Sequence, residues 1–391
     1  MNDVFIVKAL RTPFGSLGGA LSAVAAPQLA AQVMSALLDS SRLAPSQIGE
    51  VIIGQVLQGG CGQAPARQAL RAAGIPDAVP AMTINKVCGS GLKAIMLAAD
   101  SIRLGETSLA LAGGMENMSM APHVLSRARF GYRLGDGTLS DLMILDGLRD
   151  PYSGRHMGEI TDAWVEKHGL SREHQDEFAL RSYRLAQAAV NDGVFAEELA
   201  AVVIKGSKGE QRVEQDEEPF KVDFDRLPQL KPVFSKTGTL TAGNASTIND
   251  GAALCLVASE RGLKDQGLAP LARLMAQATH STDPALFAEA PVEAIRRVVA
   301  RAGLKIGDID LFEINEAFAA VPLVAMRLLN LDPEKVNVNG GAVAIGHPIG
   351  ASGARLLATL VRELRRRGLR YGVATLCIGG GEAVAVCIEA L

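Results

Sequence analysis

The chain has 391 residues, more than the roughly 250–300 at which one hydrophobic core usually stops growing, so two or three lobes are expected. Hydrophobic residues make up 48% and charged residues 21% of the sequence, as in ordinary globular proteins. The formal net charge of −3 and the aromatic content of 4% argue against nucleic acid or an anionic membrane surface as a partner.

The first ten residues read as a polar start followed by a short strand, without the charged, apolar and small-residue order of a secretory signal. No apolar run approaches the ~18 residues that a membrane-spanning helix requires. Five cysteines, an odd number spread through a long chain, argue against a disulfide framework and for a reducing compartment. We therefore expect a cytoplasmic protein.

The first 119 residues alternate between apolar strands and a helix. The predicted strands are Asp3–Val7, Val51–Ile53, Ala81–Asn85 and Leu109–Ala112. Before the last of them, Leu92–Arg103 has apolar positions at helical spacing. Several strands are almost continuously apolar, as buried central strands are. The pattern predicts an α/β fold with helices on the faces of a mixed or parallel sheet.

Residues 120–249 differ from what precedes and follows them. They contain the only tryptophan and three of the four tyrosines of the chain. Ser171–Asp192 is an amphipathic helical stretch, and Lys205–Asp225 is a charged run that reads as a loop. We interpret this segment as an inserted lobe that covers one end of the remaining structure.

Strand and helix alternate again after the insertion. The helix predicted there is Arg355–Arg367, which has apolar positions at helical spacing. The predicted strands are Ala252–Val257, Leu311–Ile314, Val336–Val338, Gly372–Leu376 and Ala383–Ile388. The same alternation on both sides of the insertion predicts two related halves.

Internal similarity supports these two halves. Three pairs of segments follow the same order at nearly the same offset: Leu43–Gly54 with Leu304–Asn315, Gly89–Ala94 with Ala351–Leu356, and Leu111–Glu116 with Ile378–Glu382. We therefore divide the chain into an N-terminal half (1–119 with 250–271), the inserted lobe (120–249) and a C-terminal half (272–391).

Cys88 has a setting that suits a nucleophile. It follows a strand and directly precedes Gly89-Ser90-Gly91, which opens an apolar helix. A thiol at a helix N-terminus meets partial positive charge and unpaired N–H groups, which favour the reactive thiolate. The alternative is that Cys88 is a small buried core residue, as most free cysteines are, and the local sequence leaves both possibilities open.

Two further residues lie in glycine-rich turns of the C-terminal half. His347 lies within Gly340–Gly350, where it could accept a proton or could simply bond to the backbone. Cys377 ends an apolar strand before three glycines, and its repeat counterpart near Gly113–Gly114 has no cysteine. The second thiol could form a disulfide, bind a metal or act as an acid or base.

Sequence motifs for metals and nucleotides are missing. There is no Cys-x-x-Cys pair and no pair of histidines at helical spacing, which disfavours a metal site. The glycine runs fit neither the phosphate loop of kinases nor the Gly-x-Gly-x-x-Gly turn of dinucleotide-binding enzymes. A kinase or a dehydrogenase is therefore disfavoured.

Taken together, the motifs resemble the thiolase family, and most closely its short-chain biosynthetic branch. Seven motifs carry the resemblance, in the family's order and across the whole chain: Asn85–Lys93, Ala112–Glu116, Thr241–Ser246, Asn315–Phe318, Asn337–Ala342, Gly346–Gly353 and Cys377–Gly381. The resemblance implies the thiolase fold, in which two βαβαβαββ halves with mixed five-stranded sheets are arranged in α-β-α-β-α layers. It also implies a homotetramer, built as a dimer of dimers.

The resemblance implies that two acetyl-CoA molecules condense to acetoacetyl-CoA and CoA, or that the reverse thiolysis takes place. Cys88 would attack the thioester while His347 takes its proton, and Cys377 would remove the α-proton of the second acetyl-CoA. His347 and a water positioned by Asn315 would hold the enolate oxygen. The backbone N–H groups of Cys88 and Gly379 would hold the tetrahedral oxyanion.

CoA would be a substrate and product, without a tightly bound cofactor or a metal. The resemblance implies that its pantetheine arm is lined by Leu148, His156, Met157, Phe234, Ala242, Ser246, Ala317 and Phe318. Lys221 stands near the place where many relatives have an arginine for the adenine end of CoA. Met157 would help to limit the acyl pocket, and Phe287 would also shape it.

Three alternatives remain after this resemblance. A 3-ketoacyl-CoA thiolase of fatty-acid degradation, acting on longer chains, shares most of the motifs. An inactive acyl-CoA-binding protein would need neither reactive thiol. A condensing enzyme acting on carrier-protein substrates typically lacks the second cysteine, so Cys377 argues against it.

Overall fold

The computed structural model describes residues 2–206 and 209–391. Their main feature is a ten-stranded mixed sheet with the order β12-β13-β14-β11-β1-β10-β5-β3-β4, in which β2 pairs with β10 outside this path. The strands are β1 (Val4–Arg11), β2 (Gly15–Ser16), β3 (Glu50–Gly54), β4 (Ala81–Ile84), β5 (Leu109–Asn117), β10 (Asn249–Ser259), β11 (Ala272–Ser281), β12 (Leu311–Ile314), β13 (Tyr371–Ile378) and β14 (Glu382–Ala390).

The path consists of two half-sheets of similar connectivity. In the first half-sheet, β3 runs parallel to β4 and β5, while β10 is antiparallel to β5 and β1. In the second half-sheet, β12 is parallel to β13, and β14 is antiparallel to β13 and β11. Two residue pairs, Phe5 with Arg273 and Ile6 with Ala272, join β1 to β11. The two half-sheets are therefore continuous through hydrogen bonds.

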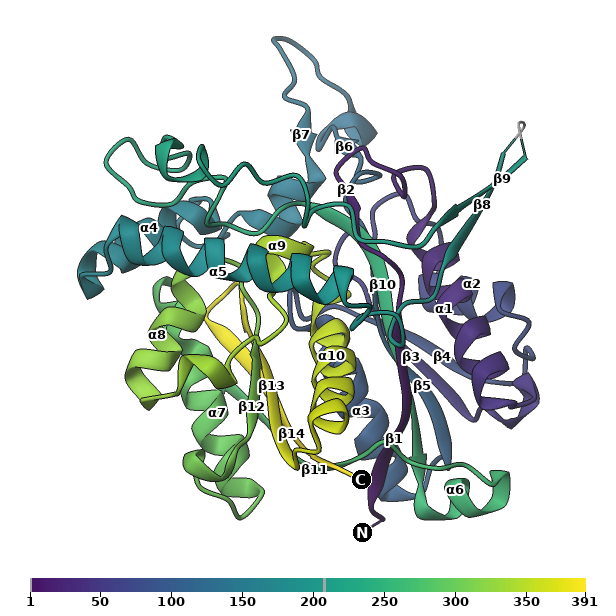
Figure 1. Ribbon diagram of the computed structural model, residues 1–391. Coiled ribbons are helices and arrows are strands. Elements are labelled where there is room, and N and C mark those ends of the chain that lie inside the picture. Colours follow the sequence, from purple (N-terminus) through teal and green to yellow (C-terminus); the bar gives the residue numbers. More distant parts are fainter. Residues whose placement is uncertain (1, 207–208) are drawn as a thin grey trace.

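Two central helices, α3 (Ser90–Leu104) and α10 (Ser352–Arg367), contact each other between the half-sheets (Figure 1). A single buried cluster contains apolar residues of both helices and of both half-sheets. On the outer faces, α1 (Ala26–Ser41) covers the first half-sheet and α7 (Ala290–Arg301) covers the second. The smaller helices α2 (Pro65–Ala72) and α8 (Ala320–Leu329) join these outer layers. The predicted α-β-α-β-α layering is therefore confirmed.

Glycines allow the two central helices to approach each other at their N-termini. A Cβ atom on Gly91 would lie 2.8 Å from the carbonyl oxygen of Gly350, and one on Gly353 would lie 2.7 Å from Leu92. Both distances are shorter than a carbon atom can tolerate. Because Gly91 and Gly353 occupy equivalent places in the repeat, each helix leaves room for the start of the other. Two helix N-termini, with their unpaired N–H groups, thus meet at one place.

The strand register corrects the predicted counterpart of Cys377. Ile53 pairs with Gly113, and its repeat equivalent Ile314 pairs with Thr375. Two residues further along each strand, Cys377 therefore corresponds to Met115, not to Gly113–Gly114. The prediction matched glycines, whereas the alignment of the halves is set by the hydrogen-bonded register of the sheets.

The predicted strand Val336–Val338 is reduced to isolated bridges. Asn337 interrupts it with a φ of 48°. Its side chain instead pairs with the backbone of Ile314, since Oδ1 accepts from the N–H and Nδ2 donates to the carbonyl oxygen, both at 2.8 Å. An amide side chain thus replaces the strand pairing that the apolar residues led us to expect.

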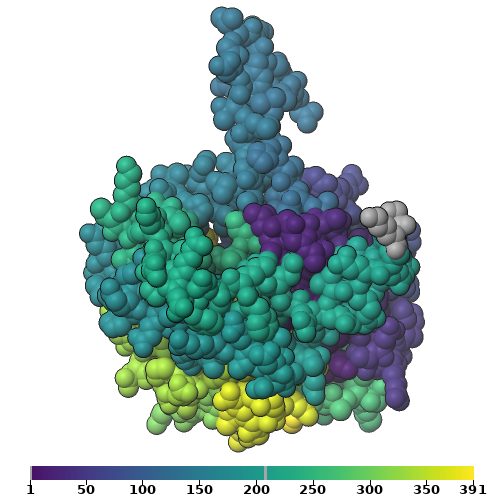
Figure 2. Space-filling view, turned by 45° about the horizontal axis from the view of Figure 1, so that its top comes forward, coloured from purple at the N-terminus to yellow at the C-terminus, as the bar shows by residue number. Residues whose placement is uncertain are grey.

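Residues 120–249 contain two longer helices, α4 (Met157–His168) and α5 (Arg172–Asn191), and a π-helical turn, Met143–Leu148. Part of the charged run predicted as a loop forms a hairpin of β8 (Val202–Gly206) and β9 (Gly209–Val213), while residues 207 and 208 of that run lie outside the described residues. The two short strands β6 (His123–Val124) and β7 (Ser140–Asp141) form the base of a protrusion, residues 123–141, that stands away from the body of the molecule (Figures 1 and 2).

A buried ion network connects residues 120–249 to β1. The Arg11 guanidinium is fully buried and contacts both carboxylate oxygens of Asp216, at 2.6 and 2.9 Å, and Oε1 of Glu198 at 2.6 Å. It also lies over the rings of Phe14 and Phe195.

Within the described ranges, no helix is long and apolar enough to cross a membrane.

Candidate active site

A cavity of about 200 Å³ opens where the two central helices begin, and residues of both halves line it. Cys88, His347, Cys377 and Gly379, predicted as catalytic from the sequence, all lie on its wall. Asn315 contacts the His347 ring. Of the residues expected along the pantetheine arm, the same cavity is lined by Leu148, His156, Met157, Phe234, Ser246, Ala317 and Phe318.

Cys88 is presented by a tight turn before α3. The turn is held by Ser90, whose hydroxyl donates to the Val87 carbonyl (2.7 Å) and accepts from the Lys86 N–H (2.8 Å). Val87 has a φ of 44°, a left-handed conformation that is unusual for a β-branched residue. Burial raises the pKa of Cys88 to about 11, although hydrogen bonds from the backbone N–H groups of Gly379 and of Cys88 itself oppose the rise. The residue therefore rests as a thiol that two N–H donors already face.

His347 is held in one tautomer. Ser352 donates its hydroxyl proton to the Pro348 carbonyl (2.9 Å), so its oxygen is left to accept from Nδ1 of His347 (2.5 Å). The proton of the neutral ring must then lie on Nδ1, and Nε2 keeps its lone pair. Burial, followed by the charge of Arg355, lowers the pKa of His347 to about 3. The ring is thus a neutral base whose second nitrogen, Nε2, lies beside the Asn315 amide.

Asn315 follows β12 and is fully buried. Its Nδ2 lies 3.3 Å from Nε2 of His347. Its Oδ1 is buried and accepts no hydrogen bond from the described residues. A buried amide oxygen without a partner suits the holding of a water or a polar substrate atom.

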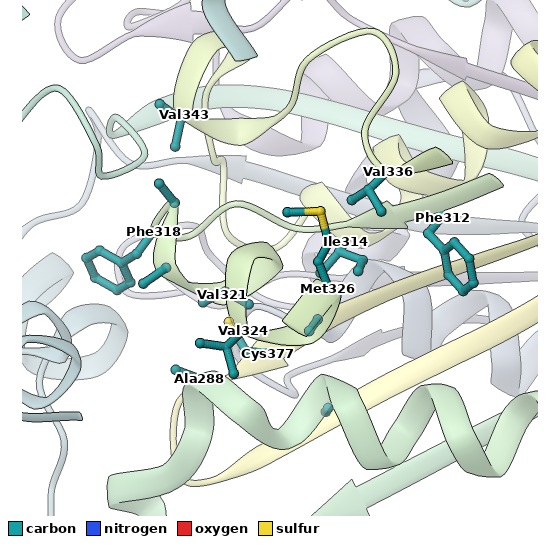
Figure 3. Close-up of a cluster of buried hydrophobic side chains, with 14 of the residues drawn as sticks. Ala288, Phe312, Ile314, Phe318, Val321, Val324, Met326, Val336, Val343 and Cys377 are labelled. Carbon is teal, nitrogen blue, oxygen red and sulfur yellow. The ribbon is translucent and has the colours of Figure 1, made fainter. Parts of the chain in front are cut away.

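Cys377 is the last residue but one of β13 and lines the cavity. It is 1% exposed, and Figure 3 shows it within a buried cluster beside Val324 and Ala288. Burial, and secondarily the charge on Cys88, raise the pKa of Cys377 well above its ordinary value. A thiolate formed here would therefore be a strong base.

The turn after Cys377 requires its glycines. Gly380 and Gly381 have φ values of 91° and 85°, in the region that side chains rarely adopt. The turn directs the Gly379 N–H toward the Cys88 sulfur. Two backbone donors, from Cys88 and Gly379, are thereby aimed at the place where an oxyanion would form on an acyl group bound to Cys88.

Three aromatic rings form one side of the cavity. His156 stacks on Phe234 with centroids 4.9 Å apart, and Phe234 meets Phe318 edge-on at 6.0 Å. The segment Thr241–Ser246 is joined to the segment carrying Phe318 by a hydrogen bond from the Ser246 N–H to the Ala317 carbonyl, 3.0 Å. The wall is thus apolar, with polar groups at few points, as in sites that hold long organic ligands.

A second cavity of about 300 Å³ shares Thr247 with the first. Ala242 and Lys221 line this second cavity instead of the first. The Lys221 ammonium contacts Ser16 and lies 3.7 Å from Oε1 of Glu218. Arg226 lines the same cavity and was not singled out from the sequence, because the charged loop gave no signal that distinguishes one cation from another.

Ser352 was also missed by sequence reasoning. The signal that could have found it is the repeat, because Ser90 and Ser352 occupy equivalent positions at the start of α3 and α10. In both places the hydroxyl donates to a carbonyl of the preceding loop and accepts from a residue of a catalytic turn.

Among the described residues, no group of three or more histidine, cysteine or acidic side chains could hold a metal ion.

Comparison with protein families matches nearly the whole chain. Residues 4–261 match the family described as "Thiolase, N-terminal domain", and residues 268–390 match "Thiolase, C-terminal domain".

Individual relatives match over the same length. The chain is 50% identical over 397 aligned residues to an acetyl-CoA acetyltransferase of Cupriavidus necator, with 100% of both chains covered. It is 49% identical over 390 residues to one of Pseudomonas aeruginosa, with 99% of both covered. A crystal structure of the Bacillus anthracis acetyl-CoA acetyltransferase superposes with a TM-score of 0.98 at 43% identity, covering 100% of this chain and 99% of that one.

Proposed function

The chain belongs to the thiolase family, and from this premise we propose that it is an acetyl-CoA C-acetyltransferase. It condenses two acetyl-CoA molecules to acetoacetyl-CoA and CoA, and it catalyses the reverse thiolysis. The observation that carries the proposal is the meeting of Cys88, His347 and Cys377 on one small cavity. Binding alone would need neither thiol, so an inactive acyl-CoA-binding protein is disfavoured.

In the first half-reaction, the Cys88 sulfur attacks the thioester carbonyl and its proton passes to Nε2 of His347. The N–H groups of Cys88 and Gly379 hold the oxyanion; one such donor is worth about 3 kcal/mol when removed singly. The C–S bond to CoA breaks, and the departing sulfur takes the proton of Cys377. An acetyl group is then bound to Cys88, with a Cys377 thiolate opposite a protonated His347.

In the second half-reaction, the Cys377 thiolate removes an α-proton from a second acetyl-CoA. The enolate oxygen is held by protonated His347 and by a water bound to Asn315. The enolate carbon attacks the acetyl group, the new C–C bond forms, and the bond to Cys88 breaks. Cys88 takes back its proton from His347, and Cys377 keeps the α-proton, so all groups return to their starting state.

The small acyl site supports acetyl transfer over the longer-chain alternative. Met157 and Phe287 are buried and line the cavity near the two thiols. A cavity of about 200 Å³ that must also admit the end of the pantetheine arm leaves space for a short acyl group. The names of the relatives favour the same assignment.

The remaining parts of the proposal concern CoA binding and assembly. We assign residues 120–249 as the CoA-binding lobe, with the nucleotide end of CoA in the second cavity near Lys221 and Arg226. CoA is substrate and product, and no resident cofactor is needed. We also propose that the protein is cytoplasmic and forms homotetramers. Assembly is supported by two surfaces that the described chain leaves uncovered: the outer edge of β4, where Met82 is 45% exposed, and the protrusion, where Phe130 and Leu134 are 91% and 99% exposed.

The test is thiolysis of acetoacetyl-CoA by the full chain with free CoA, compared with 3-oxooctanoyl-CoA. We expect rapid loss of acetoacetyl-CoA and a kcat/KM for the longer substrate that is lower by at least tenfold. Cys88→Ala should abolish turnover. Cys377→Ala should still form an acetyl-enzyme but fail to exchange the α-protons of acetyl-CoA with deuterated solvent. Equal activity on both substrates would contradict the acetyl assignment, and exchange in Cys377→Ala would contradict the role of that thiol.

A further inference from the structure

One fully buried carboxylate near the site has no part in the reaction described above. Glu116 lies near the end of β5 and is 0% exposed. Its carboxylate accepts three backbone N–H groups: those of Val56 and Gly350 on Oε2, both at 3.0 Å, and that of Leu57 on Oε1 at 3.1 Å. The donors belong to two loops that are distant in sequence and come from different halves of the molecule.

Both of these loops form the surroundings of the reacting groups. Gly350 ends the His347–Gly350 turn, and only Ala351 separates it from the start of α10. Val56 and Leu57 belong to a buried cluster with Ile349, against which Cys88 packs. Glu116 therefore connects the turn that carries the base to the wall that supports the nucleophile.

Three N–H donors at one point need a carboxylate. It offers two acceptor oxygens and no donor, whereas an amide offers one oxygen and turns an NH₂ group toward the remaining N–H. Burial raises the pKa of Glu116 to about 7, against the three N–H bonds that lower it, so the charged group is costly to place here. A peptide carbonyl could satisfy a single N–H at less cost, but not three from two loops.

Packing around Gly350 leaves the turn no alternative position. A Cβ atom on Gly350 would lie 2.6 Å from the Met115 carbonyl oxygen and 2.7 Å from Oε2 of Glu116. The backbone of the turn is thus pressed against β5 and against the carboxylate itself. If the carboxylate no longer accepted the Gly350 N–H, that N–H would be buried without a partner unless the turn moved.

We infer that Glu116 is a positioning residue, whose carboxylate holds the His347–Gly350 turn and the Val56–Leu57 loop in the relative placement that brings His347 to Cys88. It is not among the residues that line the cavity of Cys88, His347 and Cys377. Its effect on catalysis therefore acts through the place of the His347 ring, while the binding of CoA, in the lobe on the other side of the cavity, is left unchanged. The inference rests on the proposed function for its kinetic readout only.

The test compares Glu116→Gln with a matched control, Glu198→Gln. Glu198 is another buried carboxylate, bonded to Arg11 and Thr359 and not to either loop. The concentration of folded protein is taken from the amplitude of the cooperative thermal unfolding transition, so that kcat refers only to folded protein. For Glu116→Gln we expect kcat per site to fall by at least tenfold with KM changed less than threefold. Glu198→Gln should keep kcat per site within threefold even if its melting temperature falls.

Hydrogen exchange gives a second readout that does not depend on activity. In Glu116→Gln, the amides of residues 55–58 and 346–352 should exchange deuterium at least tenfold faster than in the unchanged chain, whereas Glu198→Gln should leave them unaffected. Faster exchange with an unchanged kcat per site would reduce Glu116 to a structural role and overturn the inference. Unchanged exchange would also overturn it. Lack of thiolysis by the unchanged chain would refute the proposed function instead, and the exchange experiment would still test the link between the loops.

Discussion

At the scale of single residues, one hydroxyl group determines which nitrogen of His347 carries the proton. The Ser352 hydroxyl donates its hydrogen bond to the Pro348 carbonyl, so toward Nδ1 of His347 it can only act as an acceptor. Without that acceptor, the neutral ring can place its proton on Nε2, where it cannot take the proton of Cys88. The hydroxyl is therefore worth more to catalysis than to stability.

Ser352→Ala should accordingly lower kcat/KM by on the order of 10²-fold, the lower end of what a positioned general base contributes. The loss should appear in the rate of acetyl-enzyme formation, measured by rapid quench and mass spectrometry. Ser352→Thr, which keeps the hydroxyl, should recover at least part of the rate. If Ser352→Ala formed the acetyl-enzyme at the unchanged rate, the tautomer of His347 would not depend on this residue.

Most of the proposed catalytic side chains could be singled out from the sequence because they lie in short glycine-rich motifs whose neighbours are also their structural partners; Asn315 is the exception. Cys88 and His347 are examples, since their turns are formed by residues within five positions. Glu116 could not be assigned a role in this way. Its three donors come from residues that are 59, 60 and 234 positions away, and no local pattern encodes such contacts.

At the scale of elements, the crossing of α3 and α10 brings two opposing effects into competition. In the interior of an isolated helix, replacing a glycine by alanine stabilises by roughly 0.5–1 kcal/mol, which is an upper bound for Gly91, the second residue of α3. At Gly91, however, the added carbon would lie 2.8 Å from a backbone oxygen of Gly350, and backbone cannot rotate away as a side chain can. Overpacking of this kind costs about 1–3 kcal/mol.

We therefore expect Gly91→Ala to destabilise the protein by about 1–2 kcal/mol net and to lower activity, because the displaced carbonyl belongs to the His347 turn. Chemical denaturation would measure the change. Gly307→Ala is the control, since nothing lies within 4 Å of a Cβ atom there, and it should leave both stability and activity nearly unchanged. A stabilised Gly91→Ala variant would show that the helices can separate without cost.

Hydrophobic patterns predicted the helices and strands whose backbone groups pair with other backbone groups. They failed where a side chain takes over the hydrogen bonds of a neighbouring backbone. The central helices and most strands followed their patterns. The expected strand Val336–Val338 did not form, because the Asn337 amide takes the place of a neighbouring backbone. The charged run Lys205–Asp225 was predicted as a loop, but its first part belongs to the β8–β9 hairpin, in which consecutive exposed residues pair as strands at the protein surface.

At the scale of the whole molecule, the protrusion carries the most exposed large apolar side chains among the described residues. Phe130 and Leu134 are almost entirely exposed, and they belong to a segment that leaves the body at the paired residues Val124 and Ser140 (Figure 2). A lone chain would gain nothing from two such side chains in water. Their burial against other copies would explain their presence.

Replacing residues 125–139 by an Asn-Gly turn, which suits a two-residue connection between antiparallel strands, should therefore convert the proposed tetramers to dimers. Light scattering after size-exclusion chromatography would measure the mass. Phe130→Ser with Leu134→Ser should weaken the tetramer in the same direction, while Leu104→Ser, at a residue 77% exposed on the opposite end of a central helix, should not. Unchanged tetramers in the shortened chain would assign assembly to another surface.

The hydrogen bonds between β1 and β11 have a consequence for motion. Many enzymes with a site between two halves close on their substrate by turning one half about a flexible connection. Here such a turn would break the strand pairing at Phe5 and Ile6 and separate two helices that meet without space for a methyl group. The two halves are therefore expected to move as one rigid body. Any opening that admits the two successive CoA substrates must come from the inserted lobe, residues 120–249.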